Sequence, residues 1–318
     1  MELDLKKCAR ALALIVVGVV FIVSALAKLS SIDSFVLYVF SFGFFSFDVS
    51  SVLARLVVGG ELFLGAGLLS GLYSRFFKQA ALFALAVFTL FLFALLVMGE
   101  EGNCHCMGEA FELSPGKSVL KNVALVALLY FGERRFGFRL DKLAVALIAV
   151  FAFVGVFAYV PPDFLLKKKE LKVGENNLMK YLNEEAAFDG TDFQKGKYII
   201  CFYSTKCKVC LLSARKMDLF MDRYNIPDTS VVQLFKAAYG TDFKAEGIED
   251  ELESQLLAFS EKSEARLVEK HHFVKDADLW SMTHVVPMFV FLKDGKVVDK
   301  LNYRGLTEER IELFLSKE

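Results

Sequence analysis

Two close pairs of cysteines are the residues of this 318-residue chain best suited to carry chemistry. One pair is a C-x-C motif, at Cys104 and Cys106, and the other is a C-x-x-C motif, at Cys207 and Cys210. Structural disulfides usually join distant segments of a chain. Pairs this close therefore indicate redox chemistry or metal binding.

The C-x-x-C pair stands between an expected strand and an expected helix. Residues 197–203, KYIICFY, have the composition of a buried strand, and residues 211–224 carry apolar side chains at helical spacing. This order puts the first thiol at a helix N-terminus, where the helix dipole and free N–H groups stabilise a thiolate. We therefore expect Cys207 to be the exposed attacking thiol and Cys210 to be the resolving thiol.

A structural disulfide and half of a zinc site are the alternatives for this pair. No second C-x-x-C and no suitably spaced histidine pair completes a zinc site, so we favour redox chemistry and predict no metal. Lys206 and Lys208 would add to the stabilisation of the thiolate. Cys201, six residues before Cys207, is expected to be a small buried residue of the strand.

The C-x-C pair lies in the segment 102–108, GNCHCMG, after a long apolar run. A disulfide between Cys104 and Cys106 would close a small strained ring, and strain raises the reduction potential, which makes an oxidant. His105 is suited to carry a proton near neutral pH, with a solvated loop histidine as the equal alternative. Together with Met107 these side chains are also soft ligands for Cu(I) or mercury, so metal binding or transport is a competing function.

The chain around these pairs changes character at Pro162. Its composition is 55% hydrophobic with 33 Phe, and the apolar runs end there. We expect a membrane domain over 1–162, a linker over 163–174 and a soluble α/β domain over 175–318. The net charge of −1 gives nucleic-acid binding no electrostatic basis.

The first domain is expected to be an α-helical membrane bundle of about five spans, because its apolar runs are long enough to cross about 30 Å of hydrocarbon. The segment 34–47 is apolar but short, and we interpret it as interfacial or re-entrant, so four spans plus a re-entrant piece is the alternative. A cleaved signal peptide is disfavoured for the first run, which is long and lacks a clear A-x-A site. The expected spans are 11–32, 52–74, 80–99, 117–132 and 143–162.

Positive charge orients this bundle. If five spans alternate, three basic segments fall on one side, which we assign to the cytoplasm, and the acidic loop 100–117 falls outside. The domain after Pro162 is then outside too, although the basic run 167–169 opposes this. The C-x-C loop and the soluble domain would share the outer, periplasmic face of the cell membrane. The basic residues are Lys6, Lys7, Arg10, Arg75, Lys78, Arg134, Arg135, Arg139 and Lys142.

Lys28, Arg55 and Glu61 are ionisable residues inside the first two expected spans. Charges in hydrocarbon are costly and usually mark function or mutual pairing. One hypothesis is a quinone or proton site below the C-x-C pair. The equal alternative is a structural ion pair, with Lys28 and Arg55 snorkelling outward. The glycines at 59–60 and 65–67 are typical of close helix packing.

The soluble half resembles the thioredoxin superfamily over residues 175–318. The resemblance rests on Cys207-Lys-Val-Cys210 after a strand and on Val286-Pro287 before a hairpin. It implies that Pro287 follows a cis peptide bond and faces the redox pair. Two positions depart from the family: its usual Trp before the first Cys is Lys206, and its frequent buried acid is Cys201.

The membrane half resembles the MauE branch of the DoxX-like family over about residues 10–132. The matching features are the C-x-C-x-G signature at 104–108 and the runs around Lys28 and Glu61, with Met107 in place of an aromatic residue. The resemblance implies a role in forming disulfides in exported proteins, often beside a separate thioredoxin-like partner. Some relatives pass electrons to quinone, which suggests a membrane quinone as acceptor here.

These observations predict a thiol–disulfide oxidoreductase with no covalently bound cofactor, acting on exported protein thiols at the lipid bilayer. Substrate dithiols would reduce Cys207–Cys210, which would be re-oxidised through Cys104–Cys106 and then by quinone. A reductase or isomerase of exported proteins is the first alternative, and the soft-metal protein is the second. A structural anchor would leave both cysteine pairs unexplained.

Overall fold

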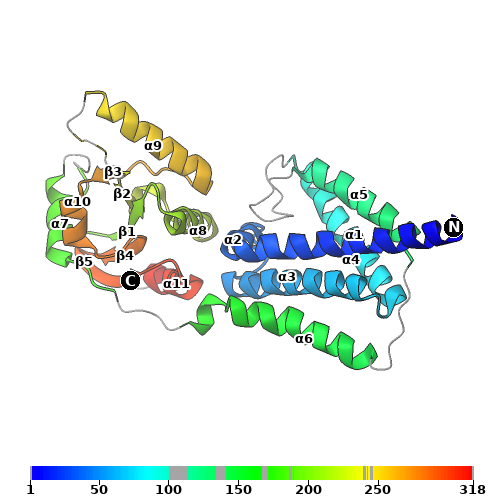
Figure 1. Ribbon diagram of the computed structural model, residues 1–318. Coiled ribbons are helices and arrows are strands. Elements are labelled where there is room, and N and C mark those ends of the chain that lie inside the picture. The colour runs from blue at the N-terminus through cyan, green and yellow to red at the C-terminus, as the bar shows by residue number, and fades with distance from the viewer. Residues whose placement is uncertain are drawn as a thin grey trace. The chain divides into compact units, whose positions relative to one another are not determined.

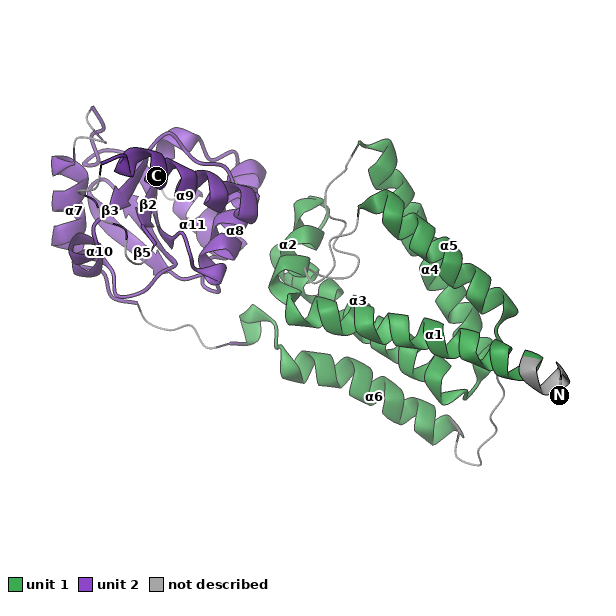
Figure 2. Ribbon diagram, turned by 45° about the horizontal axis from the view of Figure 1, so that its top comes forward, with its two compact units in different colours: residues 1–165 green, residues 166–318 purple. Residues whose placement is uncertain are grey.

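The computed structural model describes residues 2–99, 114–133, 141–166, 171–185, 188, 190–238, 241, 243 and 246–316. It divides into two compact units, residues 1–165 and residues 166–318 (Figures 1 and 2). The division falls inside the segment 163–174, which the sequence assigns to a linker.

Unit 1 is entirely helical where it is described. Four of its helices are long and apolar enough to cross a membrane: α1 over Lys6–Ser30, α3, α4, and α6 over Lys142–Tyr159. They correspond to four of the five expected spans. The helices of the unit are α1 (Glu2–Ser30), α2 (Ile32–Ser41), α3 (Phe47–Ser70), α4 (Ser74–Val97), α5 (Pro115–Phe131) and α6 (Asp141–Tyr159), followed by the short 3-10 helix Asp163–Leu165.

The two remaining helices, α5 and α2, correspond to the shortest expected span and to the expected interfacial segment. The expected span 117–132 is α5, whose 17 residues extend about 26 Å, less than the about 30 Å of a bilayer core. The expected interfacial segment 34–47 overlaps α2, a 10-residue helix packed against α3. The number of membrane crossings therefore stays a prediction.

Helix α3 is the centre of unit 1, because it packs against α1, α2, α4 and α6 (Figure 2). Its approach to α1 depends on glycine: a Cβ added at Gly65 would lie 2.8 Å from the carbonyl oxygen of Gly18 and 2.7 Å from Ile22. Small residues let two helix backbones come this close, which strengthens dispersion contacts where no hydrophobic effect acts. The glycine pattern of α3 thus sets the spacing of the bundle.

Arg55 of α3 holds the end of α6. Its Nε donates to Val160 O at 2.7 Å and one terminal nitrogen donates to Pro161 O at 3.1 Å. The other terminal nitrogen donates to Ser51 O and Oγ, and the side chain is 2% exposed. The last carbonyls of a helix have no partner within the helix, and a guanidinium offers five donors in a fixed plane. Arg55 therefore does not snorkel outward but joins α6 to α3.

We predict that Arg55→Met lowers the thermal midpoint of the detergent-solubilised chain by roughly 5–10 °C, because charge-assisted hydrogen bonds to three residues are lost. The measurement is the loss of the monodisperse peak in size-exclusion chromatography after heating. Lys142→Met, an exposed lysine on α6 itself, is the matched control and should change little. Equal midpoints for the two variants would contradict the proposed joint.

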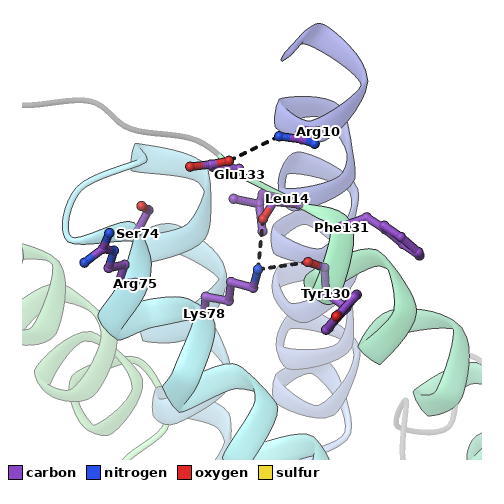
Figure 3. A pocket seen from close by; sticks show the side chains of 9 residues that line it. Arg10, Leu14, Ser74, Arg75, Lys78, Tyr130, Phe131 and Glu133 are labelled. Carbon is purple, nitrogen blue, oxygen red and sulfur yellow. Dashed lines mark hydrogen bonds and ion pairs between the residues drawn. The ribbon is translucent and has the colours of Figure 1, made fainter. Parts of the chain in front are cut away.

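Basic residues of α1 and α4 meet at one end of the bundle (Figure 3). Arg10 of α1 pairs with Glu133 at 3.4 Å, just after α5. Lys78 of α4 donates to the carbonyls of Tyr130 and Gly132, both at 3.1 Å. The beginning of α1, the beginning of α4 and the end of α5 are therefore neighbours, as the expected alternation of helices requires.

Unit 2 is built on a five-stranded mixed sheet of order β3-β2-β1-β4-β5. Strand β1 runs parallel to β2 and antiparallel to β4, and β5 is antiparallel to β4. The strands are β1 (Lys197–Ser204), β2 (Val231–Lys236), β3 (His271–Val274), β4 (Met288–Lys293) and β5 (Lys296–Leu301).

Helices cover both faces of this sheet (Figure 1). Leucines of α7 and α10 join Ile200, Phe202 and Val232 in one core. On the opposite face, Phe259 of α9 lies against the ring of Tyr203 at 5.6 Å, and α11 places Phe314 on the sheet. The helices are α7 (Glu175–Glu184), α8 (Lys208–Tyr224), α9 (Ile248–Ser263), α10 (Asp276–Met282) and α11 (Glu308–Ser316).

Only the first part of the charged segment 246–272 is helical. Helix α9 ends at Ser263, because Glu264 adopts a left-handed conformation with φ of 52°. His271 then begins β3, a strand of three half-buried residues and the buried Val274, which pairs with β2. Four residues at a sheet edge are too few to give a recognisable alternation of apolar and polar side chains.

Candidate active site

The backbone places Cys207 at the start of α8, directly after the turn that follows β1. Cys207 is the N-cap residue, and its Sγ accepts a hydrogen bond from the backbone N–H of Cys210 at 3.3 Å. Cys207 is partly exposed, whereas Cys210 is fully buried. Both thiols are free in this structure. One sulfur is thus open to a partner and the other is shielded one turn below it.

Hydrogen bonds separate the acidities of these thiols. The Cys210 side chain, followed by the backbone N–H groups of Cys210 and Val209, lowers the pKa of Cys207 to about 6. The same contact, with burial, raises the pKa of Cys210 far above its ordinary value. The sequence suggested that Lys206 and Lys208 would help, but the stabilising groups are the facing thiol and the helix N-terminus. Cys207 is therefore the more acidic thiol of the pair.

Pro287 lies at the same end of the sheet. The register pairs Met288 with Phe202, so the residue before Met288 lies beside the C-terminal end of β1, which leads to Cys207. The peptide bond between Val286 and Pro287 is cis.

A buried thiol and a buried phenol lie beneath the pair. Cys201 of β1 is fully buried, and this burial raises its pKa to about 12. Tyr203 points to the same face two residues later and is also fully buried, which raises its pKa well above the ordinary range. The neighbouring Cys201 thiol and the carboxylate of Asp218 add to this rise. Both groups therefore keep their protons at neutral pH.

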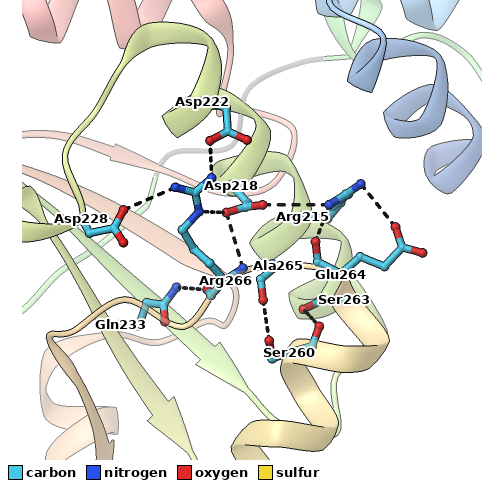
Figure 4. A network of polar contacts seen from close by, with 10 residues as sticks. All are labelled: Arg215, Asp218, Asp222, Asp228, Gln233, Ser260, Ser263, Glu264, Ala265 and Arg266. Atoms are coloured by element: carbon cyan, nitrogen blue, oxygen red, sulfur yellow. Dashed lines mark hydrogen bonds and ion pairs between the residues drawn. The ribbon is translucent and has the colours of Figure 1, made fainter. Parts of the chain in front are cut away.

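Asp218 of α8 connects this buried region to a polar network (Figure 4). Its side chain is 11% exposed and accepts hydrogen bonds from the Arg266 guanidinium and backbone N–H. Arg266 also contacts Asp222 and Asp228. Pattern reading missed this carboxylate because its partner lies 48 residues away. The network fixes α8, and with it the position of Cys207 and Cys210, against the segment after α9.

The membrane unit brings together two of its three expected ionisable residues. Lys28 Nζ lies 2.8 Å and 2.9 Å from the two carboxylate oxygens of Glu61 and 2.7 Å from Ser24 Oγ. Lys28 is 1% exposed and Glu61 is 19% exposed. Arg55 is engaged elsewhere, at the end of α6. Lys121 of α5 lies within electrostatic reach of both members of the pair.

Asn122, next to Lys121, is a second buried polar group of the bundle that the sequence did not assign to the site. Its Nδ2 donates to Thr89 Oγ1 at 3.0 Å, which joins α5 to α4. Its Oδ1 is buried and has no hydrogen-bond partner among the described residues. A buried acceptor without a partner is costly and commonly marks a place where another group binds.

The C-x-C motif, with Cys104, His105 and Cys106, lies outside the described residues, so its chemistry stays a prediction. Within the described parts of the chain, no group of three or more His, Cys, Asp or Glu side chains could hold a metal ion.

Fold and site together define a class: a multi-pass membrane protein whose helical unit is followed by an α/β unit with a dithiol at a helix N-terminus. Residues 6–133 match the family model described as Methylamine utilisation protein MauE, and they form a MauE-like membrane domain. A curated relative, Protein TlpB of Flavobacterium psychrophilum, is 30% identical over 125 residues, which is 37% of this chain and 34% of TlpB. The chain thus matches about a third of that relative's length. No solved structure matches.

We predict that alkylation of Cys207 in the reduced chain follows a titration with a midpoint near pH 6. Cys210→Ala should move this midpoint upward, because the strongest hydrogen bond to the thiolate is lost, and Cys210→Ser should move it less. The measurement is the rate of iodoacetamide labelling of the Cys207 peptide by mass spectrometry at pH 4–9. Val209→Ala is the control, because its backbone N–H remains. An unchanged midpoint in Cys210→Ala would show that the Cys210 side chain does not lower the pKa of Cys207.

A double-mutant cycle separates the two interpretations of Lys28 and Glu61. Lys28→Met and Glu61→Leu should each destabilise the chain by about 3–5 kcal/mol, because each leaves one buried charge without a partner, whereas the double variant should be near the original stability. Stability is followed by thermal size-exclusion chromatography, and turnover by oxidation of a model dithiol in membranes. A stable double variant that has lost turnover indicates a proton or quinone site. A double variant that recovers both stability and turnover indicates that Lys28 and Glu61 form a structural ion pair.

Proposed function

We propose that this chain is a membrane thiol–disulfide oxidoreductase that forms disulfides in exported proteins through Cys207 and Cys210. The observation that carries the proposal is the placement of Cys207: it is partly exposed, stands at the N-terminus of α8 and has a pKa of about 6. A thiol of this kind is a thiolate at neutral pH, and the thiolate is the reactive form.

We further infer that unit 2 has a thioredoxin-like fold. Three features support this: a central strand that leads into the C-x-x-C helix, a mixed sheet with helices on both faces, and a cis proline before β4. The strand β3 and the helix α10 stand between β2 and β4. They place additional chain beside the redox pair's end of the sheet.

Thiolate stabilisation favours the oxidising direction. The pKa of Cys207 is lowered from 9.0 to about 6 in the folded dithiol form. This lowered pKa stabilises the folded dithiol form. The stabilisation is complete above pH 9 and is lost as the pH falls through about 6. A stabilised reduced form makes the corresponding disulfide a stronger oxidant. The disulfide of Cys207 and Cys210 should therefore accept electrons readily from substrate dithiols.

The proposed exchange balances two electrons. A substrate thiolate attacks Cys207 Sγ and releases Cys210 as the leaving thiolate, which takes up a proton because its pKa is raised. The second substrate thiolate then attacks the mixed disulfide, forms the substrate disulfide and releases Cys207. The substrate is oxidised, and Cys207 and Cys210 are reduced to the dithiol.

Re-oxidation would use Cys104 and Cys106 on the same outer face of the membrane. This placement rests on the basic residues that assign the opposite end of the bundle to the cytoplasm. A strained disulfide between residues two apart is suited to oxidise the soluble pair.

A membrane quinone would supply the final two-electron acceptor. The membrane unit offers residues that would fit the reduced form of such a group: the buried Oδ1 of Asn122 could accept a hydrogen bond from a quinol hydroxyl, and Lys28 and Glu61 could hold a proton between them. This part of the proposal depends on the double-mutant cycle described above.

The deciding experiment is thiol trapping in cells with non-reducing gels. Cys210→Ser should accumulate mixed disulfides with exported proteins, because the resolving thiol is missing, while Cys207→Ser should trap none. In the unsubstituted chain we expect Cys207 and Cys210 to be mostly oxidised. A mostly reduced pair would instead support a reductase or isomerase.

The C-x-C loop needs its own variants in that experiment. Cys104→Ser and Cys106→Ser should each leave Cys207 and Cys210 reduced, because the route of re-oxidation is cut. Cys8→Ser is the control, an exposed cysteine outside both pairs. If neither pair changes redox state and the purified chain carries metal that is lost in Cys104→Ser, the soft-metal function replaces this proposal.

A further inference from the structure

A cavity of about 480 Å³ opens at the basic end of the membrane unit, away from both cysteine pairs in the sequence (Figure 3). Its walls come from three elements: the first turns of α1, the first turns of α4 and the residues that end α5. It is lined by Arg10, Arg75 and Lys78, with Glu133 as its one carboxylate. Three cations against one anion give the cavity a net positive charge.

This charge is only partly neutralised within the protein. Glu133 pairs with Arg10 at 3.4 Å. Arg75 and Lys78 have no acidic partner among the described residues. Lys78 donates to two carbonyls at the end of α5, which leaves the third N–H of its ammonium group for another acceptor. Two positive side chains on one helix thus face the cavity without a counter-ion.

The beginning of α4 adds further donors. Tyr73, its N-cap residue, has a φ of 40° and makes no side-chain hydrogen bond to the helix. The first N–H groups of a helix have no partner inside it, and the positive end of the helix dipole lies there. Ser74 and Arg75, in this first turn, line the cavity. An uncapped helix N-terminus beside two unpaired cations is a suitable place for a phosphate group.

Aromatic side chains complete the site. Tyr130 and Phe131 also line the cavity and are 75% and 68% exposed. Exposed aromatic residues at the end of a membrane helix sit at the level of lipid headgroups. Leu14 supplies an apolar wall. A ligand here would therefore meet positive charge at its head and apolar surface beside it.

We propose that this cavity binds the phosphate group of an anionic phospholipid such as phosphatidylglycerol. The basic end of the bundle is the end assigned to the cytoplasmic leaflet, where basic pockets between membrane helices bind anionic headgroups. A bound lipid would bridge α1, α4 and the end of α5. A soluble phosphate ester shares the recognised chemistry, and the test separates the two sources.

The test is native mass spectrometry of the purified full chain in mild detergent, with phosphatidylglycerol or phosphatidylcholine added at equal concentration. The unsubstituted chain should retain phosphatidylglycerol preferentially. Arg75→Gln should reduce this preference about tenfold, because a charge-assisted hydrogen bond is lost. Lys142→Gln, an exposed lysine of α6 outside the cavity lining, is the matched control and should keep the preference.

A second arm adds inorganic phosphate without lipid and follows the thermal midpoint. Protection by phosphate alone, lost in Arg75→Gln, would support a phosphate site whose ligand is a soluble ester. Equal retention of the two lipids by the unsubstituted chain, with no protection by phosphate, would overturn the proposal. So would full retention of the preference in Arg75→Gln. The comparison of the two lipids on the unsubstituted chain tests the proposed lipid binding even if Arg75→Gln does not fold.

Discussion

The hydrogen bonds that Cys207 Sγ accepts at the start of α8 are the interaction around which unit 2 is organised. They require a helix N-terminus next to the end of a central strand and a second thiol one turn inside the helix. The sheet supplies the strand, and its two helical layers hold α8 in place. The contacts of Arg266 with three aspartates anchor that helix from its outer side. Packing remote from the sulfur thus determines which thiol is ionised.

Unit 1 obeys a different constraint, since hydrocarbon offers no solvent for a polar group. Its two most deeply buried cations solve this within the protein, but with different acceptors. Lys28 pairs with a carboxylate, and Arg55 donates to carbonyl and hydroxyl oxygens. The first arrangement joins α1 to α3 through a buried ion pair. The second closes the bundle by holding α6 against α3.

The two units together suggest a division of labour. A dithiol with a stabilised thiolate is suited to exchange with protein thiols, while an ion pair inside a helical bundle is suited to handle protons in a low-dielectric medium. In the proposed relay, the C-x-C motif at Cys104 and Cys106 would link these two functions chemically. The basic cavity lies where α1 and α4 begin and α5 ends, and we propose for it a separate role, the binding of a lipid headgroup.

The sequence alone determined the order of the elements around Cys207 and four of the membrane helices, because both depend on local patterns: strand, motif and helix in succession, and long uncharged runs. It also determined that charges lie inside the bundle. Tertiary structure decided their partners, since Lys28 and Glu61 are 33 residues apart and Arg55 meets carbonyls more than 100 residues away. It likewise decided that a facing thiol, and not the adjacent lysines, acidifies Cys207. Local patterns report which face of an element is apolar, but pairing between distant residues depends on how whole elements pack, which no local pattern contains.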